Sequence, residues 1–431
     1  MSDLYNRPAK RFTRAMIAYV LQQNNVKALV ADPIDTPQVV TYAIHLAAGT
    51  KPEKVKALAD ALAIATGAPE EVRLARRGMV LLLEIPKQQP QVLPVATFER
   101  HLKDQSGPYS VALGVGTDGQ VVRWSLASQE NPHLLIAGAS GSGKTVALHW
   151  ILYRLLLQND PDRLRLVLCD PKGGELEPFR HIAHLAQPVV SSGPDIAGVL
   201  AWAREQITRR VAERQNPDHL ARLVVVIDEA SALTQGDKRI KELLEQITQL
   251  GRGPGVHCIA TAQHPRSEDL GTLGIANFPC RLVGSVSSGT LAYSAAGRAQ
   301  TMVERLRGKG DFLYLPRGSR MYRLQVPLFD PWDARFGAEI RDRLARLPHA
   351  DAPALDIPAS PPPPANGRGG WNRKELDEET LAALGAAFAD GQTAAQVSKK
   401  FGLNYERAKR LHEAYWNEGA EWPPQSEAVT Q

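Results

Sequence analysis

The stretch His133-Leu-Leu-Ile-Ala-Gly-Ala-Ser-Gly-Ser-Gly-Lys-Thr145, followed by Val146, decides the fold of this 431-residue chain. Four apolar residues run directly into Gly138–Thr145, and a helical pattern follows from Val146 to Leu157. A glycine-rich loop between a buried strand and a helix is the setting of a phosphate-binding loop. The alternative, a glycine-rich turn with an accidental lysine, would have to explain all eight positions and both flanking elements. We therefore expect a nucleoside triphosphate to bind here.

The phosphate-binding loop assigns roles to its residues. Glycines let successive backbone N–H groups converge on phosphate oxygens, and the Lys144 ammonium reaches the β- and γ-phosphates. The Thr145 hydroxyl is a candidate ligand of Mg²⁺. All eight residues are expected nucleotide contacts: Gly138, Ala139, Ser140, Gly141, Ser142, Gly143, Lys144 and Thr145.

A second apolar run, Leu223–Ile227, decides what the nucleotide is used for, since the loop alone could serve a kinase, a switch or a motor. The run places Asp228 at a strand's C-terminal end, where its carboxylate can hold Mg²⁺ through water. Glu229 follows directly and can polarise an attacking water, although a solvated strand end is the plain alternative. An Asp-Glu pair is typical of a hydrolase, because a kinase must keep water away. The two motifs together predict nucleotide hydrolysis.

Two further candidates flank the strand pattern Val256–Ala262. Arg252 lies in a glycine-rich turn before it, badly placed for a core ion pair and well placed to project at a neighbour. Gln263 ends the pattern and carries a neutral donor and acceptor able to sense a γ-phosphate. Simple solvation of both loops remains an alternative from the residues alone.

The whole chain predicts an α/β protein of several domains. Between residues 109 and 327, short β-branched runs alternate with helical stretches, which predicts a mostly parallel sheet with its active site at the strand C-termini. A small mixed α/β domain precedes this part, and a helical stretch with a proline- and glycine-rich linker follows it. The expected domains are residues 1–105, 106–330, 331–370 and 371–431.

The last segment shows three short helical patterns, of which the second and third read as a helix-turn-helix. The third pattern begins near Asn404 and would present basic residues to DNA. A charged helix in a protein-docking domain is the alternative. The candidate DNA contacts are Asn404, Arg407, Lys409 and Arg410.

Composition excludes some classes of protein. The formal net charge of +5 is compatible with a polyanionic partner without establishing one. The three cysteines, Cys169, Cys258 and Cys280, lie far apart in apolar runs, as expected for buried thiols in a reducing cytosol. No apolar run approaches the ~20 residues of a membrane span, and the first residues form no secretory signal. The sequence predicts a cytoplasmic protein without a membrane segment.

Together these motifs resemble the FtsK/SpoIIIE family of ring-shaped double-stranded DNA translocases. The matching stretches follow the family's order and similar intervals along the chain: residues 132–146, 170–179, 224–231, 251–265, 276–288 and 308–316. Residues 39–68 and 81–90 look like the family's domain before the motor, and residues 401–411 resemble the recognition region of its winged-helix domain.

The resemblance implies a RecA-like P-loop motor that assembles as a hexameric homo-oligomer around duplex DNA, with ATP and Mg²⁺ between adjacent subunits. Lys144, Thr145, Asp228 and Glu229 carry over directly. Arg252 falls at the arginine-finger position, acting on the neighbour's γ-phosphate, and Gln263 falls at the sensor position. Asp170 and Lys172 match the family's Asp-Pro-Lys turn, which implies a role beside the nucleotide or the DNA pore.

The leading interpretation is an ATP-hydrolysing motor that moves double-stranded DNA and carries a C-terminal DNA-recognition module. Without the membrane segments and long linker of chromosomal versions, the chain is expected to be a compact plasmid, phage or mobile-element variant. Two alternatives remain open: a conjugative or mobile-element DNA-transfer ATPase, and an ATP-switched DNA-binding adaptor for partition or regulation.

Overall fold

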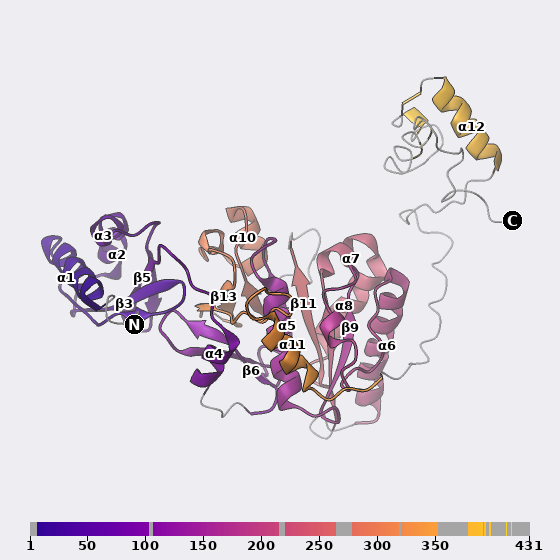
Figure 1. Ribbon diagram of the computed structural model, residues 1–431, viewed down its shortest axis with the longest axis horizontal. Helices are drawn as coiled ribbons and strands as arrows, with labels where there is room; N and C mark the ends of the chain where they lie inside the picture. Colours follow the sequence, from indigo (N-terminus) through magenta and orange to yellow (C-terminus); the bar gives the residue numbers. More distant parts are fainter. Residues whose placement is uncertain are drawn as a thin grey trace. The chain divides into compact units, whose positions relative to one another are not determined.

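A computed structural model describes residues 7–102, 107–214, 220–263, 278–318, 320–351 and 378–390, with isolated positions at 392–393, 396–397, 411 and 415. The chain divides by its contacts into two compact units, residues 1–360 and 361–431 (Figure 1). Within the described ranges, no helix is both long enough and apolar enough to span a bilayer.

The first part of unit 1 is an antiparallel sheet in the order β1-β3-β5-β4, with β2 paired to β3. Helices α1 and α3 pack together on it, and Ile17, Tyr42 and Leu83 are among its fully buried core residues. Its elements are α1 (Arg7–Gln23), β1 (Ala28–Val30), β2 (Ile34–Asp35), β3 (Val39–Leu46), α2 (Pro52–Lys56), α3 (Ala59–Thr66), β4 (Arg73–Arg77) and β5 (Val80–Pro86).

The second part of unit 1 is a nine-stranded sheet in the order β7-β6-β14-β13-β12-β8-β11-β10-β9. Its strands are β6 (Ser110–Gly116), β7 (Val121–Ser125), β8 (Leu134–Ala137), β9 (Leu164–Cys169), β10 (Arg222–Ile227), β11 (Val256–Ala262), β12 (Cys280–Val283), β13 (Asp311–Leu315) and β14 (Tyr322–Gln325). The helices are α4 (Val95–His101), α5 (Lys144–Gln158), α6 (Gly193–Ala212), α7 (Ala230–Gly236), α8 (Lys238–Leu250), α10 (Gly289–Ala296) and α11 (Gly337–Ala345), with 3₁₀ turns at Glu177–Phe179 and Val303–Arg305.

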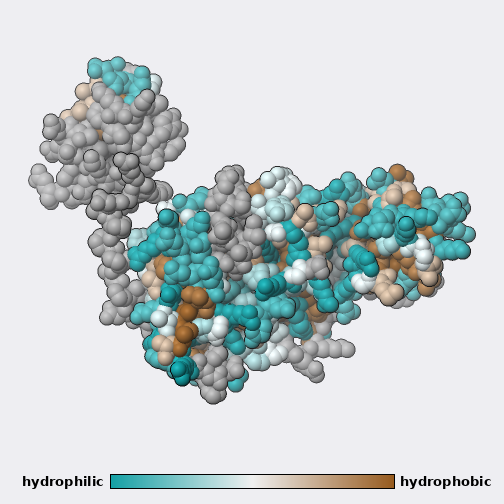
Figure 2. Space-filling model, turned by 180° about the vertical axis from the view of Figure 1, so that it is seen from behind, coloured by the Kyte–Doolittle hydropathy of each residue, from teal (hydrophilic) through white to brown (hydrophobic). Residues whose placement is uncertain are grey.

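The central strands bury both faces, which explains their nearly continuous apolar sequence. In β10, Val224 and Val226 face the core shared with α4, α5 and α11, whereas Val225 and Ile227 face the core shared with α6, α8 and α10. The same alternation runs through β8 and β9. The three cysteines lie in these cores as buried free thiols, as the sequence predicted. The surface is largely hydrophilic in Figure 2.

The sheet is mixed, whereas the sequence predicted a mostly parallel one. Strands β9, β10, β11, β8 and β12 are parallel neighbours, but β12-β13, β13-β14, β14-β6 and β6-β7 are antiparallel. For β6-β7 and β13-β14 the reason lies in the connections, because a parallel pair needs a crossover of a dozen or more residues. Only Thr117–Gln120 joins β6 to β7, and only Pro316–Met321 joins β13 to β14. Such short links allow antiparallel pairs alone.

Unit 2 is described only in part. Helix α12 (Glu378–Ala389) buries Leu384 and Phe388, and Val397 and Leu411 are also buried. The rings of Phe388 and Tyr415 lie 5.7 Å apart, between centroids. Most of the predicted helix-turn-helix falls outside the described residues, as does the linker at 352–370.

A buried charge cluster joins the two sheets of unit 1. The Arg323 guanidinium on β14 donates two hydrogen bonds to Asp311 on β13, at 2.8 and 3.0 Å, and one to Glu84 on β5, at 2.9 Å. Thr117 donates to the other oxygen of Glu84 at 2.9 Å. The three charged side chains are almost fully buried. Burial by itself would lower the pKa of Arg323, but the two carboxylates outweigh it and raise the pKa.

We expect Arg323→Leu to lower the free energy of unfolding by about 3–5 kcal/mol, because Asp311 and Glu84 would be left buried without a cation. The measurement is urea unfolding of the full chain. Glu71→Gln is the matched control, since it breaks a pair between the same two parts of unit 1, Arg305–Glu71, whose side chains are 52% and 67% exposed. The control should cost less than about 1 kcal/mol. Equal small effects of both variants would show that the buried cluster does not hold the sheets together.

Candidate nucleotide-binding site

The phosphate-binding loop lies between the end of β8 and the start of α5, as the sequence predicted. Its glycines are required by backbone geometry: Gly138, Gly141 and Gly143 have φ values of 151°, 77° and 99°. A Cβ atom on Gly143 would also lie 3.0 Å from the backbone nitrogen of Gly310. The first turn of a helix leaves backbone N–H groups without intrahelical acceptors, so this end of α5 favours an anion.

Lys144 lies at the first position of α5, and its side chain folds back over the loop. Its Nζ donates to the backbone oxygens of Gly138 and Ala139, at 2.8 and 3.1 Å. Burial lowers the pKa of Lys144, and the carboxylates of Glu229 and Asp228 oppose that shift. The ammonium is therefore held at the centre of the loop by weak, replaceable acceptors. Phosphate oxygens would be stronger partners for it.

Asp228 and Glu229 follow β10 and face the same cavity as Lys144 and Thr145. The Thr261 hydroxyl on β11 joins them, donating to Asp228 Oδ1 at 2.7 Å and accepting from the Glu229 backbone N–H at 2.8 Å. Burial raises the pKa of Asp228, and the Thr261 hydrogen bond opposes that rise. One hydroxyl thus fixes the positions of both acidic residues.

Glu229 is held in an unusual backbone conformation, with φ 51° and ψ 53°. For a residue other than glycine, such strain costs about 1–3 kcal/mol and tends to occur at functional sites. Its Oε1 accepts from the Ser231 hydroxyl at 2.7 Å and from the Gln263 backbone N–H at 2.9 Å. Its Oε2 lies 3.4 Å from Lys172 Nζ. The carboxylate is thereby oriented from three sides.

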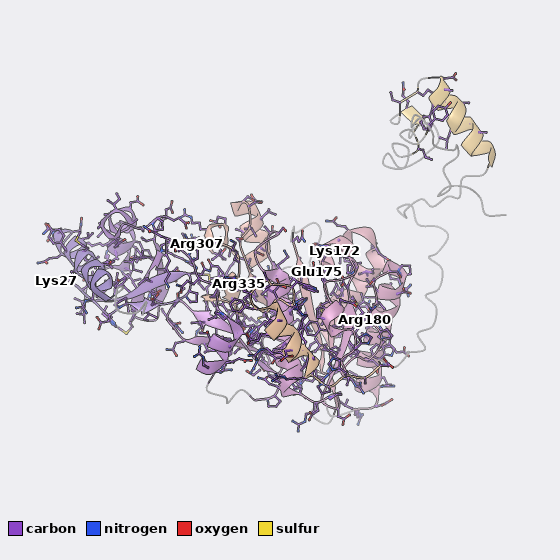
Figure 3. The ribbon with its side chains drawn as sticks, viewed as in Figure 1. Lys27, Lys172, Glu175, Arg180, Arg307 and Arg335 are labelled. Carbon is purple, nitrogen blue, oxygen red and sulfur yellow. The ribbon has the colours of Figure 1, made fainter. Side chains whose placement is uncertain are left out.

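The Asp-Pro-Lys turn after β9 has a structural residue and a cavity residue. Asp170 accepts three backbone N–H bonds, from Gly173 at 3.0 Å, Gly174 at 2.9 Å and Leu176 at 3.0 Å, and so shapes the turn. This turn places Lys172 and Glu175 at the cavity, and Figure 3 shows the two side chains beside each other. Asp170 therefore acts on the site through the turn.

The cavity has a volume of about 660 Å³, within the range of small-ligand sites. Part of its lining is formed by residues that the sequence did not indicate, namely Pro90, Val92, Lys309, Gly310, Gln325, Val326, Leu328, Asp333 and Arg335. Thr145 and Asp228 supply a hydroxyl and a carboxylate oxygen to this cavity, the hard donors that suit Mg²⁺. The residues present therefore fit a magnesium nucleotide.

The segment Arg307–Gly310 supports the loop from outside and was missed as part of the site. The backbone N–H groups of Lys309 and Gly310 donate to the carbonyls of Gly141 and Ser142, at 3.2 and 3.0 Å. Lys309 has a φ of 51°, between two glycines that also have positive φ. The sequence signal was Gly308-Lys-Gly310 before a strand, which predicts a tight turn but not its partner.

The structure does not bring Arg252 to the cavity of its own chain. Arg252 precedes β11, whereas Gln263 follows it, and the cavity lies at the Gln263 end. Seven residues of extended strand separate the two ends by about 23 Å. The exposed Arg252 guanidinium donates instead to the side chain of Gln129. Lys144, Thr145, Asp228, Glu229 and Gln263 do converge in one cavity. Asn404, Arg407, Lys409 and Arg410 lie outside the described residues.

Comparison with known proteins places this geometry in context. Residues 96–216 match the model of the FtsK/SpoIIIE family, and residues 5–87 match the FtsK alpha domain. The DNA translocase SftA of Bacillus subtilis is 29% identical over 442 residues, covering 94% of this chain and 44% of SftA. The DNA translocase FtsK of Caldanaerobacter subterraneus is 30% identical over 330 residues, covering 72% of this chain and 46% of that protein. The chain thus spans less than half the length of these two relatives.

Solved structures share the fold. The conjugation coupling protein TcpA of pCW3, in its monomer form with ATPγS, aligns with a TM-score of 0.51 and 19% identity, covering 77% of this chain and 99% of TcpA. The cytoplasmic domain of the type VII secretion ATPase EccC of Thermomonospora curvata aligns with a TM-score of 0.51 and 20% identity, covering 61% of this chain and 33% of EccC.

The antiparallel N-terminal sheet lies within residues 5–87, which match the FtsK alpha domain. Strand β8 and the phosphate-binding loop lie within residues 96–216, which match the FtsK/SpoIIIE family. Two adjacent domains of one family therefore occur in order along a chain whose relatives are named DNA translocases, as the sequence motifs predicted. The chain belongs to the FtsK/SpoIIIE family.

Proposed function

We propose that this protein hydrolyses ATP to move double-stranded DNA. The observation that carries the proposal is the convergence of Lys144, Asp228 and Glu229 in one cavity at the phosphate-binding loop. Membership of the FtsK/SpoIIIE family and the names of its relatives supply the DNA substrate. We further propose the division into domains 1–105, 106–330, 331–370 and 371–431, with a RecA-like motor in the second.

In this proposal the chain's own residues divide the work of hydrolysis. Loop N–H groups and Lys144 bind the phosphates, and Thr145 and Asp228 hold Mg²⁺, which when bound neutralises phosphate oxygens. Glu229 orients and polarises the attacking water. Because its Oε1 already accepts two hydrogen bonds, the water has to bind at Oε2, where Lys172 now lies 3.4 Å away. Gln263 lies beside the γ-phosphate position.

We propose that Arg252 acts on the nucleotide of a neighbouring subunit in a ring of identical chains. Its support is geometric, because Arg252 is exposed and lies at the opposite end of β11 from its own cavity. A residue so placed can contribute to hydrolysis only in a neighbour. Hexameric assembly is the arrangement that the family resemblance implies.

We propose that unit 2 recognises DNA through Asn404, Arg407, Lys409 and Arg410. The support is that Leu384, Phe388, Val397 and Leu411 are all buried, as the small helical core of a helix-turn-helix requires.

The proposed function predicts that long duplex DNA strongly stimulates ATP hydrolysis and that the protein displaces a triplex-forming strand from duplex DNA in an ATP-dependent reaction. The physical reason is that a motor couples each turnover to a step along its track. The measurements are steady-state ATPase rates with and without DNA, and triplex displacement. Slow hydrolysis that is indifferent to DNA, with no displacement, would identify an ATP-switched adaptor instead.

Two substitutions separate nucleotide binding from hydrolysis. Lys144→Ala should abolish ATP binding, since it removes the charge that neutralises the phosphates. Glu229→Gln should leave binding nearly unchanged and abolish turnover, because the amide keeps the size of the side chain and cannot polarise water. A titration with labelled nucleotide, paired with ATPase rates, makes the comparison. An equal loss of affinity in both variants would contradict the assigned roles.

Arg252→Ala should bind ATP normally and hydrolyse it at least ~10³-fold more slowly, the effect of a missing arginine finger. Rings mixed from Arg252→Ala and Glu229→Gln chains should recover activity, because some interfaces then combine an intact cavity with an intact arginine. Native mass spectrometry verifies the mixing. Verified mixed rings without any recovery would rule out action between subunits.

A further inference from the structure

A second concave site lies apart from the nucleotide cavity and shares none of its lining residues. It has a volume of about 620 Å³ and lies where the end of β4 meets β7 and the turn between β13 and β14. We call it the arginine groove, after the residues that dominate its lining: Arg77, Arg123, Arg317, Arg320, Tyr314 and Tyr322.

The charge of the arginine groove is largely uncompensated. Glu130 is the one carboxylate among its described lining residues, against four arginines. Asp118 pairs with Arg77, whose guanidinium also lies over the Tyr322 ring, 5.7 Å from its centroid. No carboxylate from the described part of the chain forms an ion pair with the remaining three arginines, and Nη1 of Arg123 is buried without a hydrogen-bond partner there. Like charges gathered in this way favour an anionic ligand.

The turn that carries two of these arginines is fixed through its backbone. The Arg317 N–H donates to Asn131 Oδ1 at 2.8 Å. From the other side, Arg298 donates to the carbonyls of Gly318, at 2.7 Å, and Pro316, at 3.1 Å. The Arg317 and Arg320 side chains stay exposed. The turn is therefore held by its backbone groups, and the guanidinium groups of Arg317 and Arg320 are not used to hold it.

We propose that the arginine groove binds the phosphodiester backbone of duplex DNA. Guanidinium groups match phosphate oxygens with paired hydrogen bonds, and duplex DNA carries one charge per ~1.7 Å of its axis, so one segment can engage several arginines. A protein partner fits less well, because the centres of protein interfaces are depleted of charged residues. The inference rests on the proposed function for the identity of the DNA, and adds a binding site outside the nucleotide cavity.

The test compares Arg317→Ala/Arg320→Ala with wild-type full-length chain by fluorescence anisotropy on a duplex of arbitrary sequence, over a series of salt concentrations without nucleotide. A plot of log affinity against log salt concentration falls with a negative slope, and each lost phosphate contact makes this slope shallower by about 0.9. The double variant should therefore have a slope about 1.8 shallower than wild type and bind at least ~10-fold more weakly at low salt. Arg180→Ala/Arg346→Ala is the matched control, since it removes two exposed arginines that pair with neighbouring carboxylates. Its slope should stay at the wild-type value.

Three readouts separate the outcomes. Basal ATPase without DNA should be unchanged in the Arg317→Ala/Arg320→Ala variant, because neither residue lines the nucleotide cavity. An unchanged affinity and salt slope would overturn the DNA-binding groove while leaving the motor intact. Dissociation of the oligomer in sedimentation, with DNA binding retained, would instead identify the groove as an interface between copies of the chain. Absence of DNA binding by the wild-type chain would contradict the proposed function itself.

Discussion

Burial of both faces of the parallel strands constrains everything else in the large sheet. Side chains of β8 and β10 alternate between two apolar cores, and the polar residues within β11, His257 and Thr261, are buried and hydrogen-bonded. Polar groups that can meet a ligand are therefore found where the strands end. Because these strands are parallel, their carboxyl ends meet at one edge, and the phosphate-binding loop, the Asp228-Glu229 pair and Gln263 gather there. The chemistry of the site follows from an apolar packing requirement.

The residues that sequence could identify are those with a local signature. Gly143 is one, since its positive φ and the nearby Gly310 backbone exclude other residues. Asp228 is another, because it directly ends an apolar run. Thr261 and Ser231 carry no such signature, since their importance comes from hydrogen bonds to acidic residues brought near by folding. The antiparallel pairs β6-β7 and β13-β14 did carry a signal, in the short segments that join their strands, whereas β12-β13 and β14-β6 carried none.

Glu229 illustrates how the surroundings impose a conformation that the local sequence would not choose. Its backbone lies in the left-handed region although its side chain has a Cβ. The N–H bond to Thr261 and the carboxylate bonds to Ser231 and Gln263 hold it there. Two of these contacts come from β11 or the residue after it, so the acidic residue on one strand is positioned by the next. A change in the spacing of these two strands would misplace the carboxylate.

The segment Arg307–Gly310 touches both the phosphate-binding loop and the N-terminal sheet. Its backbone N–H groups at 309 and 310 hold the loop, while the Arg307 side chain donates to the Lys87 carbonyl at 2.6 Å and to Glu70 at 2.9 Å. These four residues therefore connect the phosphate-binding loop to the alpha domain. A displacement of the loop would therefore reach that domain directly through these hydrogen bonds.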